Sequence, residues 1–148
     1  MKLVGEIFQS IYLPDGGQIC LLGNPLGVPI YLSNHNLYRL DKNEDVVWQV
    51  QRQEKPGWAW FTQYRKEAEA SNDSGPAGVG YSCFISIWLQ YADGSNNMKE
   101  GSAPKTMDWS PGCKVLAYTL GYTSIDYEID IETGIATTVL EEMVGRPW

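Results

Sequence analysis

The stretch that decides the fold is NLYRLDKNEDVVWQV, residues 36–50. Successive side chains of a strand point to opposite faces, so Tyr38 and Leu40 are expected to share one face of an outgoing strand. A polar interruption at residues 42–45 supplies a turn, and the β-branched and aromatic residues 46–50 favour a returning strand. The stretch therefore predicts an antiparallel hairpin.

A similar pattern, IDYEIDIETGIATTV, returns at residues 125–139. When the two stretches are laid over one another, Asp130 falls on Asp41 at the end of the outgoing strand. We expect each carboxylate to accept the backbone N–H groups of its turn, with Gly134 completing the second turn. The branched residues of both copies are expected to fill the same core face.

Short strands and turns dominate the rest of the chain. The expected further strands are residues 3–13, 18–22, 28–33, 83–90 and 114–120. Residues 57–61 are expected to form a strand or an aromatic loop, and residues 62–70 two helical turns with Thr62 as the N-cap. A mobile connector is expected around residues 65–80, where serine, glycine and proline accumulate.

The bulk properties limit the fold class further. A length of 148 residues suits one domain, residues 1–148, and 43% hydrophobic with 20% charged residues is typical of a globular chain. Together with the strands and turns described above, this predicts a mainly-β fold class: a twisted antiparallel meander of hairpins, which the resemblance described below implies are blade-like, with at most one or two short helices. The three cysteines are odd in number and widely spaced, which favours buried thiols over disulfides.

The net charge of −7 limits the choice of partner. It repels a phosphate backbone, and no Lys/Arg cluster reverses it locally, so we expect no nucleic-acid partner and favour a basic protein. The N-terminal stretch lacks a continuous secretory core, and no run of about 18 apolar residues occurs. We therefore expect a cytoplasmic protein that binds no membrane.

The paired hairpins resemble a known repeat. Leu37-Tyr38-Arg39-Leu40-Asp41 with its return to Trp48, and Ile129 to Ile135, look like the repeat of quinoprotein-type β-propellers. The order of elements also resembles that of short uncharacterised bacterial proteins, over residues 28–50 and 81–140. A closed propeller needs at least about four blades, and this chain has length for about three, so the resemblance implies an incomplete, propeller-like arrangement. No quinone-binding residue is carried over, because no position beyond the structural turn matches.

Signatures of catalysis are sparse. His35 is the only histidine, no two cysteines have metal-ligand spacing, and neither a phosphate-binding glycine loop nor a nucleophile elbow occurs, so we expect no cofactor and no metal. The enzymatic alternative is a carbohydrate or small-ligand site of strand-end carboxylates beside Trp48 or Trp60. Its candidate carboxylates are Glu6, Asp41, Glu128, Asp130 and Glu132.

An aromatic set at Trp58, Trp60, Phe61 and Tyr64 is the candidate contact surface, because large rings give much contact area for little lost entropy. Packing of some of these rings in the core is the alternative. We therefore favour a non-catalytic protein-binding domain, of the kind in which an immunity protein masks a basic toxin. Self-assembly through exposed strand edges into a homo-oligomer is a third alternative.

Overall fold

The computed structural model describes residue 3 and residues 5–23, 28–70, 82–98, 105–119 and 124–142. Within these residues the chain forms ten strands and two helices. The strands are β1 (Ile7–Tyr12), β2 (Gln18–Leu22), β3 (Leu37–Leu40), β4 (Val46–Gln49), β5 (Gln51–Arg52), β6 (Phe84–Gln90), β7 (Lys105–Asp108), β8 (Lys114–Thr119), β9 (Ile125–Ile129) and β10 (Ile135–Thr138). The helices are α1 (Ile30–Asn34) and α2 (Ala59–Ala70).

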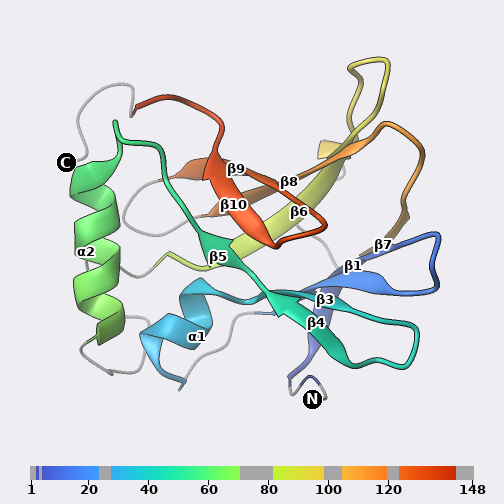
Figure 1. The fold of residues 1–148 in the computed structure, drawn as a ribbon, viewed down its shortest axis with the longest axis horizontal. Helices are drawn as coiled ribbons and strands as arrows, with labels where there is room; N and C mark the ends of the chain where they lie inside the picture. Colours follow the sequence, from blue (N-terminus) through green and yellow to red (C-terminus); the bar gives the residue numbers. More distant parts are fainter. Residues whose placement is uncertain are drawn as a thin grey trace.

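The strands make two five-stranded sheets, one above the other in Figure 1. The first sheet has the order β4-β3-β2-β1-β7, and the second has the order β5-β10-β9-β8-β6. Neighbouring strands are antiparallel except for β1 with β7 and β5 with β10, which run parallel. The predicted mainly-β class with few helices is confirmed, but each sheet contains one parallel pair that the sequence did not suggest.

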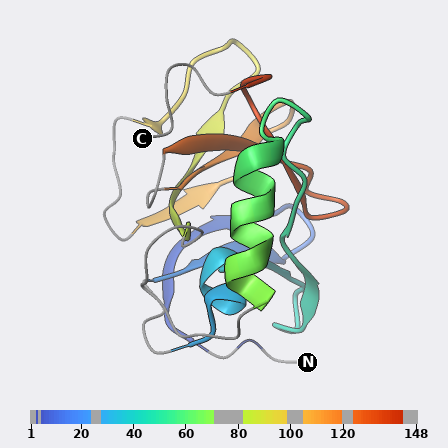
Figure 2. The ribbon, with the colours of Figure 1, turned by 90° about the vertical axis from the view of Figure 1, so that its left-hand side faces the viewer.

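Both predicted hairpins are present, one in each sheet. In β3–β4, Tyr38 lies opposite Gln49, and in β9–β10, Ala136 lies opposite Ile129. The inner faces of both sheets and one side of α2 share a single hydrophobic core. In Figure 2, α2 stands across the sheets, with α1 beside its C-terminal half.

The two hairpins do not present equivalent positions to this core, so the expectation of a common core face is wrong. The first hairpin contributes Leu37, Trp48 and Val50, whereas the second contributes Tyr127, Ile129 and Ala136. Tyr38 and Leu40, which match Tyr127 and Ile129 in sequence, are also buried but lie outside the core cluster. Alternation separates the two faces of a strand, but it does not say which face meets the core when both are buried.

Residues 28–33 form no strand, because Ile30–Asn34 is the helix α1. Its buried residues, Ile30, Ser33 and Asn34, are spaced as on one side of a helix, while Tyr31 and Leu32 are exposed. Pro29 precedes the helix with φ −53° and ψ 146°. The predicted strand is therefore wrong: the run Ile30-Tyr31-Leu32 follows the helical period and not the two-residue period of a strand.

α2 begins three residues before the predicted N-cap Thr62, and it includes residues 59–61, so the predicted strand or loop there is wrong. The N–H of Thr62 donates to Trp58 O within the first turn. Residues 65–70 form the C-terminal half of this helix, and the remainder of the predicted connector lies outside the described residues. In the described ranges, neither helix is long and apolar enough to cross a membrane.

β6 is an edge strand whose peptide groups are capped by amide side chains from elsewhere in the fold. Its N–H groups donate to three amide oxygens: Phe84 N to Asn36 Oδ1 at 3.0 Å, Ile87 N to Gln9 Oε1 at 2.8 Å and Leu89 N to Asn97 Oδ1 at 2.8 Å. Asn36 and Gln9 are fully buried, so these bonds account for two polar side chains inside the protein.

Candidate functional site

The turns of the two hairpins are held by the predicted aspartates. The Oδ1 atom of Asp41 accepts the N–H groups of Asn43 at 2.8 Å and Asp45 at 3.0 Å. The Oδ1 atom of Asp130 accepts those of Glu132 at 2.9 Å and Thr133 at 3.2 Å. Both carboxylates are therefore used to fix the backbone of their own turns.

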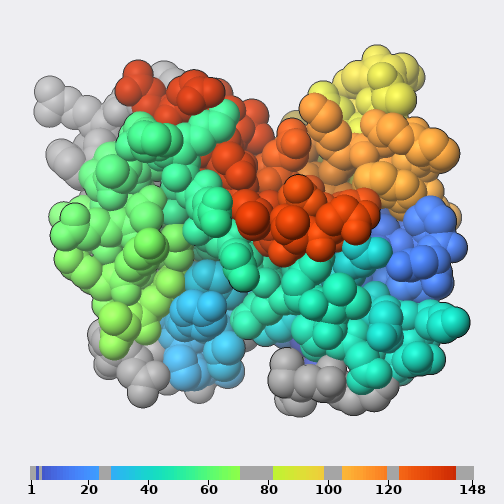
Figure 3. Space-filling model, in the orientation of Figure 1, coloured from blue at the N-terminus to red at the C-terminus, as the bar shows by residue number. Residues whose placement is uncertain are grey.

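The second turn, residues 131–134, packs directly on the first hairpin. Trp48 Nε1 donates to Ile131 O at 2.9 Å, and Arg39 Nη1 donates to the same carbonyl at 2.6 Å. Gly134 has φ +79°, and a Cβ atom there would lie 2.6 Å from a ring carbon of Trp48. We call this contact the turn junction. Figure 3 shows it as the orange-red turn lying against the teal residues of the first hairpin.

The predicted aromatic contact surface is largely buried. Trp58 and Phe61 are 3% and 0% exposed and belong to the core, so they cannot meet a partner. Trp60 is half-buried against the core, and Tyr64, 45% exposed, packs edge-on against it. Because α2 turns Trp58 and Phe61 toward the sheets, only Trp60 and Tyr64 remain near the surface.

A cluster of buried charged residues lies where α2 meets the second sheet. Its members, the charged network, are Arg52, Glu54, Arg65, Glu69 and Tyr127. The side chains of Arg52 and Glu54 are 0% exposed, and that of Arg65 is 2% exposed. This network links β5, β9 and α2 through side chains that no sequence motif connects.

Glu54 is the centre of the charged network. Arg65 donates to its two carboxylate oxygens at 2.8 Å and 3.1 Å, and Tyr127 Oη donates to Oε2 at 2.8 Å. The hydroxyl of Thr62 donates to Oε1 at 2.8 Å. Arg65 Nη1 also reaches both oxygens of Glu69 at 3.0 Å, so its guanidinium bridges two carboxylates.

The Arg52 guanidinium is enclosed by aromatic rings. Its carbon Cζ lies 4.8 Å from the ring centre of Tyr127, 5.1 Å from that of Phe84 and 5.9 Å from that of Phe61. Its Nη1 donates to Ser82 O at 2.6 Å, and its Nη2 donates to Tyr127 Oη at 2.7 Å. The rings and the hydrogen bonds together compensate for the removal of this cation from water.

Glu54 is held in its ionised form. Burial by itself would raise the pKa of Glu54, but hydrogen bonds and positive charges from Arg65 and Arg52 hold it at about 2. Burial raises the pKa of Tyr127, so its hydroxyl stays protonated and donates to Glu54. Both oxygens of the Glu54 carboxylate are occupied by donors.

His35 lies beside this network and is 4% exposed. Its Nδ1 atom is 2.8 Å from Tyr31 O, and because a carbonyl can only accept, Nδ1 carries the proton. Burial lowers the pKa of His35 to about 4, although the negative charge of Glu69 acts in the other direction. The imidazole is therefore neutral near pH 7 and stacks on Tyr31.

The three cysteines are free and buried. Burial raises the pKa of the Cys20 thiol to about 12, with a smaller contribution from the charge of Glu44. This thiol is therefore a core group and a poor nucleophile at neutral pH.

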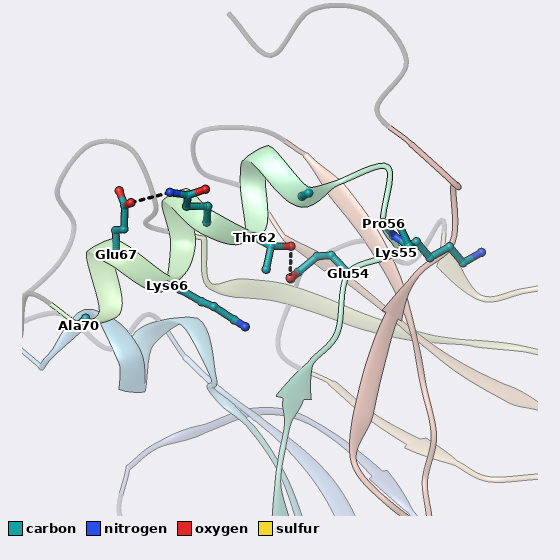
Figure 4. Close-up of a pocket in the computed structure, with 9 residues that line it drawn as sticks. Glu54, Lys55, Pro56, Thr62, Lys66, Glu67 and Ala70 are labelled. Carbon is teal, nitrogen blue, oxygen red and sulfur yellow. Dashed lines mark hydrogen bonds between the residues drawn. The ribbon is translucent and has the colours of Figure 1, made fainter.

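A groove of about 550 Å³ runs along the outer side of α2 (Figure 4). Its lining residues are Glu54, Lys55, Pro56, Ala59, Thr62, Gln63, Lys66, Glu67 and Ala70. Figure 4 shows the hydrogen bond from Thr62 to Glu54. Gln63 also donates to Glu67, at 3.0 Å. Two lysines and two glutamates line it, so the groove has no net charge of either sign.

A second groove, of about 450 Å³, lies over the outer face of β10. We call it the β10 groove, and it is lined by Lys55, Glu128, Asp130, Thr133, Ile135, Thr137, Thr138 and Val139. Lys55 closes one side, where its ammonium donates to Glu141 at 3.0 Å and to Val139 O at 3.3 Å. Glu128 and Asp130 of the β9 strand and its turn form the other side.

The outer face of β9 and the residues after β10 are strongly acidic. Residues 124–142 contain six carboxylates and no lysine or arginine. All six are exposed: Asp126, Glu128, Asp130, Glu132, Glu141 and Glu142. We call this set the acidic face.

The five carboxylates considered for carbohydrate chemistry do not all lie in one groove. Glu128 and Asp130 share the β10 groove, but Glu6, Asp41 and Glu132 do not line it. Trp48 is 8% exposed in the turn junction, and neither it nor Trp60 lines either groove. Neither of these two grooves therefore places paired carboxylates beside Trp48 or Trp60.

The charged network was missed by sequence reasoning, although α2 carries a signal for it. Trp58, Phe61, Arg65 and Glu69 follow one another at spacings of three and four residues, which places them on one side of a helix. A charged pair in line with buried aromatic rings indicates a buried ion pair. Finding its partners, Arg52 and Glu54, needed the fold.

Comparison with known proteins found no matching family model, no matching curated protein and no matching solved structure.

Proposed function

We propose that this chain is a non-catalytic protein-binding domain of the immunity-protein type, which masks a basic protein partner with its acidic face. The observation that carries the proposal is the exposure of all six carboxylates in residues 124–142, a segment that itself contains no lysine or arginine. Three of the six pair with bases from other parts of the chain, Glu128 with Lys114, Glu132 with Arg39 and Glu141 with Lys55, so an excess of negative charge remains. A surface of one sign attracts a partner of the opposite sign and increases its association rate.

Apolar surface next to the carboxylates supports a protein partner over a free ion. Val139 and Leu140 are 45% and 52% exposed beside Glu141, and Ile135 is half-buried in the β10 groove. Protein interfaces combine an apolar centre with a polar rim. The mixture on this face fits that pattern.

The occupied state of the buried polar groups supports the non-catalytic part of the proposal. Glu54 accepts four hydrogen bonds, and His35 faces a backbone carbonyl. A general base needs an accessible lone pair within reach of its substrate. The oxygens of Glu54 are occupied by donors, and the imidazole of His35 is withdrawn from the surface, with 4% of the residue exposed.

The proposal is tested by capturing partners from the source cells with the immobilised chain and then titrating the captured protein calorimetrically. Neutralising Asp126, Glu128 and Glu142 together should weaken the complex by about tenfold or more. Neutralising Glu6, Glu67 and Asp108, which are exposed elsewhere, removes the same number of charges and is the matched control. A neighbouring gene that encodes a basic toxin which binds stoichiometrically would support the proposal. The absence of any protein partner at micromolar concentration would contradict it.

A small-ligand function is the second candidate, and the groove along the outer side of α2 favours it. Its volume of about 550 Å³ lies in the range of ligand sites, and Lys66, Thr62 and Gln63 provide polar groups along it. A thermal-shift screen of glycans and common metabolites tests this candidate, because a ligand that binds only the folded chain raises its Tm. Stabilisation that Lys66→Ala abolishes would support the groove as the site, and no stabilisation by any compound would remove this candidate.

A further inference from the structure

We infer that the β10 groove holds an extended basic segment of the partner, with lysine or arginine side chains two residues apart. This inference rests on the proposed function and adds the shape and spacing of the element recognised. Ile135, Thr137 and Val139, at alternate positions along the chain, form the floor of the groove.

The spacing of the groove residues matches that of an extended peptide. Alternate residues of a strand lie about 6.6 to 6.8 Å apart on one face. The floor residues repeat in this way, and so do Glu128 and Asp130 at the acidic side. Side chains on one face of an extended segment have the same repeat, so two bases separated by one residue can meet the two carboxylates together.

A helix fits this site less well. A helix with its side chains is about 10 to 12 Å across, whereas the β10 groove is a space of about 450 Å³ over one strand. An extended segment needs only the width of a strand. The groove geometry therefore selects the extended form of the partner.

The charges of the groove select a basic segment over an acidic one. Lys55, the one lysine in its lining, is held by Glu141 at 3.0 Å, so its charge is compensated within the chain. Glu128 is paired with Lys114 at 3.7 Å, and both side chains are more than half exposed. Such a pair contributes little to stability, so an incoming base can replace Lys114 at small cost.

The inference is tested with two labelled pentapeptides of equal composition and the full-length chain, by fluorescence polarisation at low salt. Lys-Thr-Lys-Thr-Lys places bases two residues apart, whereas Lys-Lys-Thr-Thr-Lys has no such pair. The alternating peptide should bind about fivefold more tightly or better, because it engages both carboxylates together. Equal dissociation constants for the two peptides would overturn the inferred two-residue spacing of the bases.

Point variants locate the binding. Glu128→Gln should weaken the alternating peptide about fivefold, and Lys114→Ala should strengthen it about twofold by removing the competitor. Glu67→Gln, an exposed glutamate in the other groove, removes the same charge and should have no effect. Equal effects of Glu128→Gln and Glu67→Gln would show attraction by net charge alone and would overturn the inference.

A steric variant separates this inference from the proposed function. Thr137→Trp fills the floor of the groove without changing the charge, and its thermal unfolding shows whether the fold is kept. Loss of peptide and partner binding supports the groove. If the folded variant still binds the natural partner, while neutralising the acidic face weakens that complex, the groove inference fails and the proposed function stands.

Discussion

Two of the contacts between the second sheet and the rest of the molecule differ in chemistry. At the turn junction, Trp48 lies on Gly134 and two donors share the carbonyl of Ile131. At the charged network, two arginines and two glutamates are removed from water between the sheet and α2. The first place depends on close contact, and the second depends on every charge having its partner.

The difference decides how each place responds to change. A buried ion pair contributes little over apolar packing, but removing one partner leaves the other charged and desolvated. A tight contact instead fails when volume is added to it.

Glu54→Gln should break the charged network. It leaves Arg52 and Arg65 buried without their common carboxylate, and the free energy of unfolding should fall by about 3 to 5 kcal/mol. Urea denaturation measures this loss, and Glu67→Gln on the exposed side of α2 is the control, with an expected change below about 0.5 kcal/mol. A loss below about 1 kcal/mol for Glu54→Gln would show that water replaces the missing charge.

Gly134→Ala should break the turn junction. The added methyl group would meet Trp48 at 2.6 Å, and φ +79° disfavours any L side chain, so the expected loss is about 2 to 4 kcal/mol. Gly94→Ala is the matched control, because Gly94 has φ +89° with nothing within 4 Å of the added atom. The difference between the two variants measures the contact with Trp48, and similar losses would mean that backbone strain alone matters.

Acid should lower the free energy of unfolding through His35, which lies beside the charged network. Its pKa is about 4 in the fold against an ordinary value of 6.5, so the unfolded chain binds the proton more tightly. The contribution of neutral His35 to the free energy of unfolding is therefore fully present above pH 6.5. It is lost as the pH decreases toward 4, by up to roughly 3 kcal/mol. Unfolding free energies measured from pH 7 to 4 check this, and His35→Gln should flatten the profile in that window. An unchanged profile in the variant would assign the acid sensitivity to other groups.

Glu44→Gly should stabilise the turn of the first hairpin. Glu44 has φ +67°, the left-handed conformation that Gly134 provides in the second turn. Glycine removes a strain of about 1 to 2 kcal/mol but makes the unfolded chain more flexible, so a net gain of about 0.5 to 1 kcal/mol is expected. The thermal midpoint should rise for Glu44→Gly and fall for Asn43→Gly, whose φ is not positive. A lower midpoint for Glu44→Gly would mean that its side chain stabilises the turn.

Local features of the fold could be read from the sequence, and the contacts between them could not. Asp41 and Asp130 act within a few residues of their positions, so turn chemistry predicted their role. Trp48 and Gly134 are far apart in the chain, and only the arrangement of the two sheets brings them together. The same holds for the parallel pair of β1 with β7, which no local pattern indicates.

The candidate site was less predictable than the fold. The aromatic set looked like a surface because its rings follow one another closely, but a helical period turns Trp58 and Phe61 inward. Glu128 and Asp130 were recognised only as strand-end carboxylates. Their place at the side of a groove depends on Lys55, which reaches it from the loop after β5.

The capped edge of β6 bears on how copies of this chain could assemble. A neighbouring molecule that added a strand there would first have to displace the amides of Asn36, Gln9 and Asn97. The longest strand of the described fold is thus a poor template for fibre growth. The other sheet edges of the described fold are shorter: β5 has two residues, and β4 and β7 have four each, so a strand added there would form few hydrogen bonds.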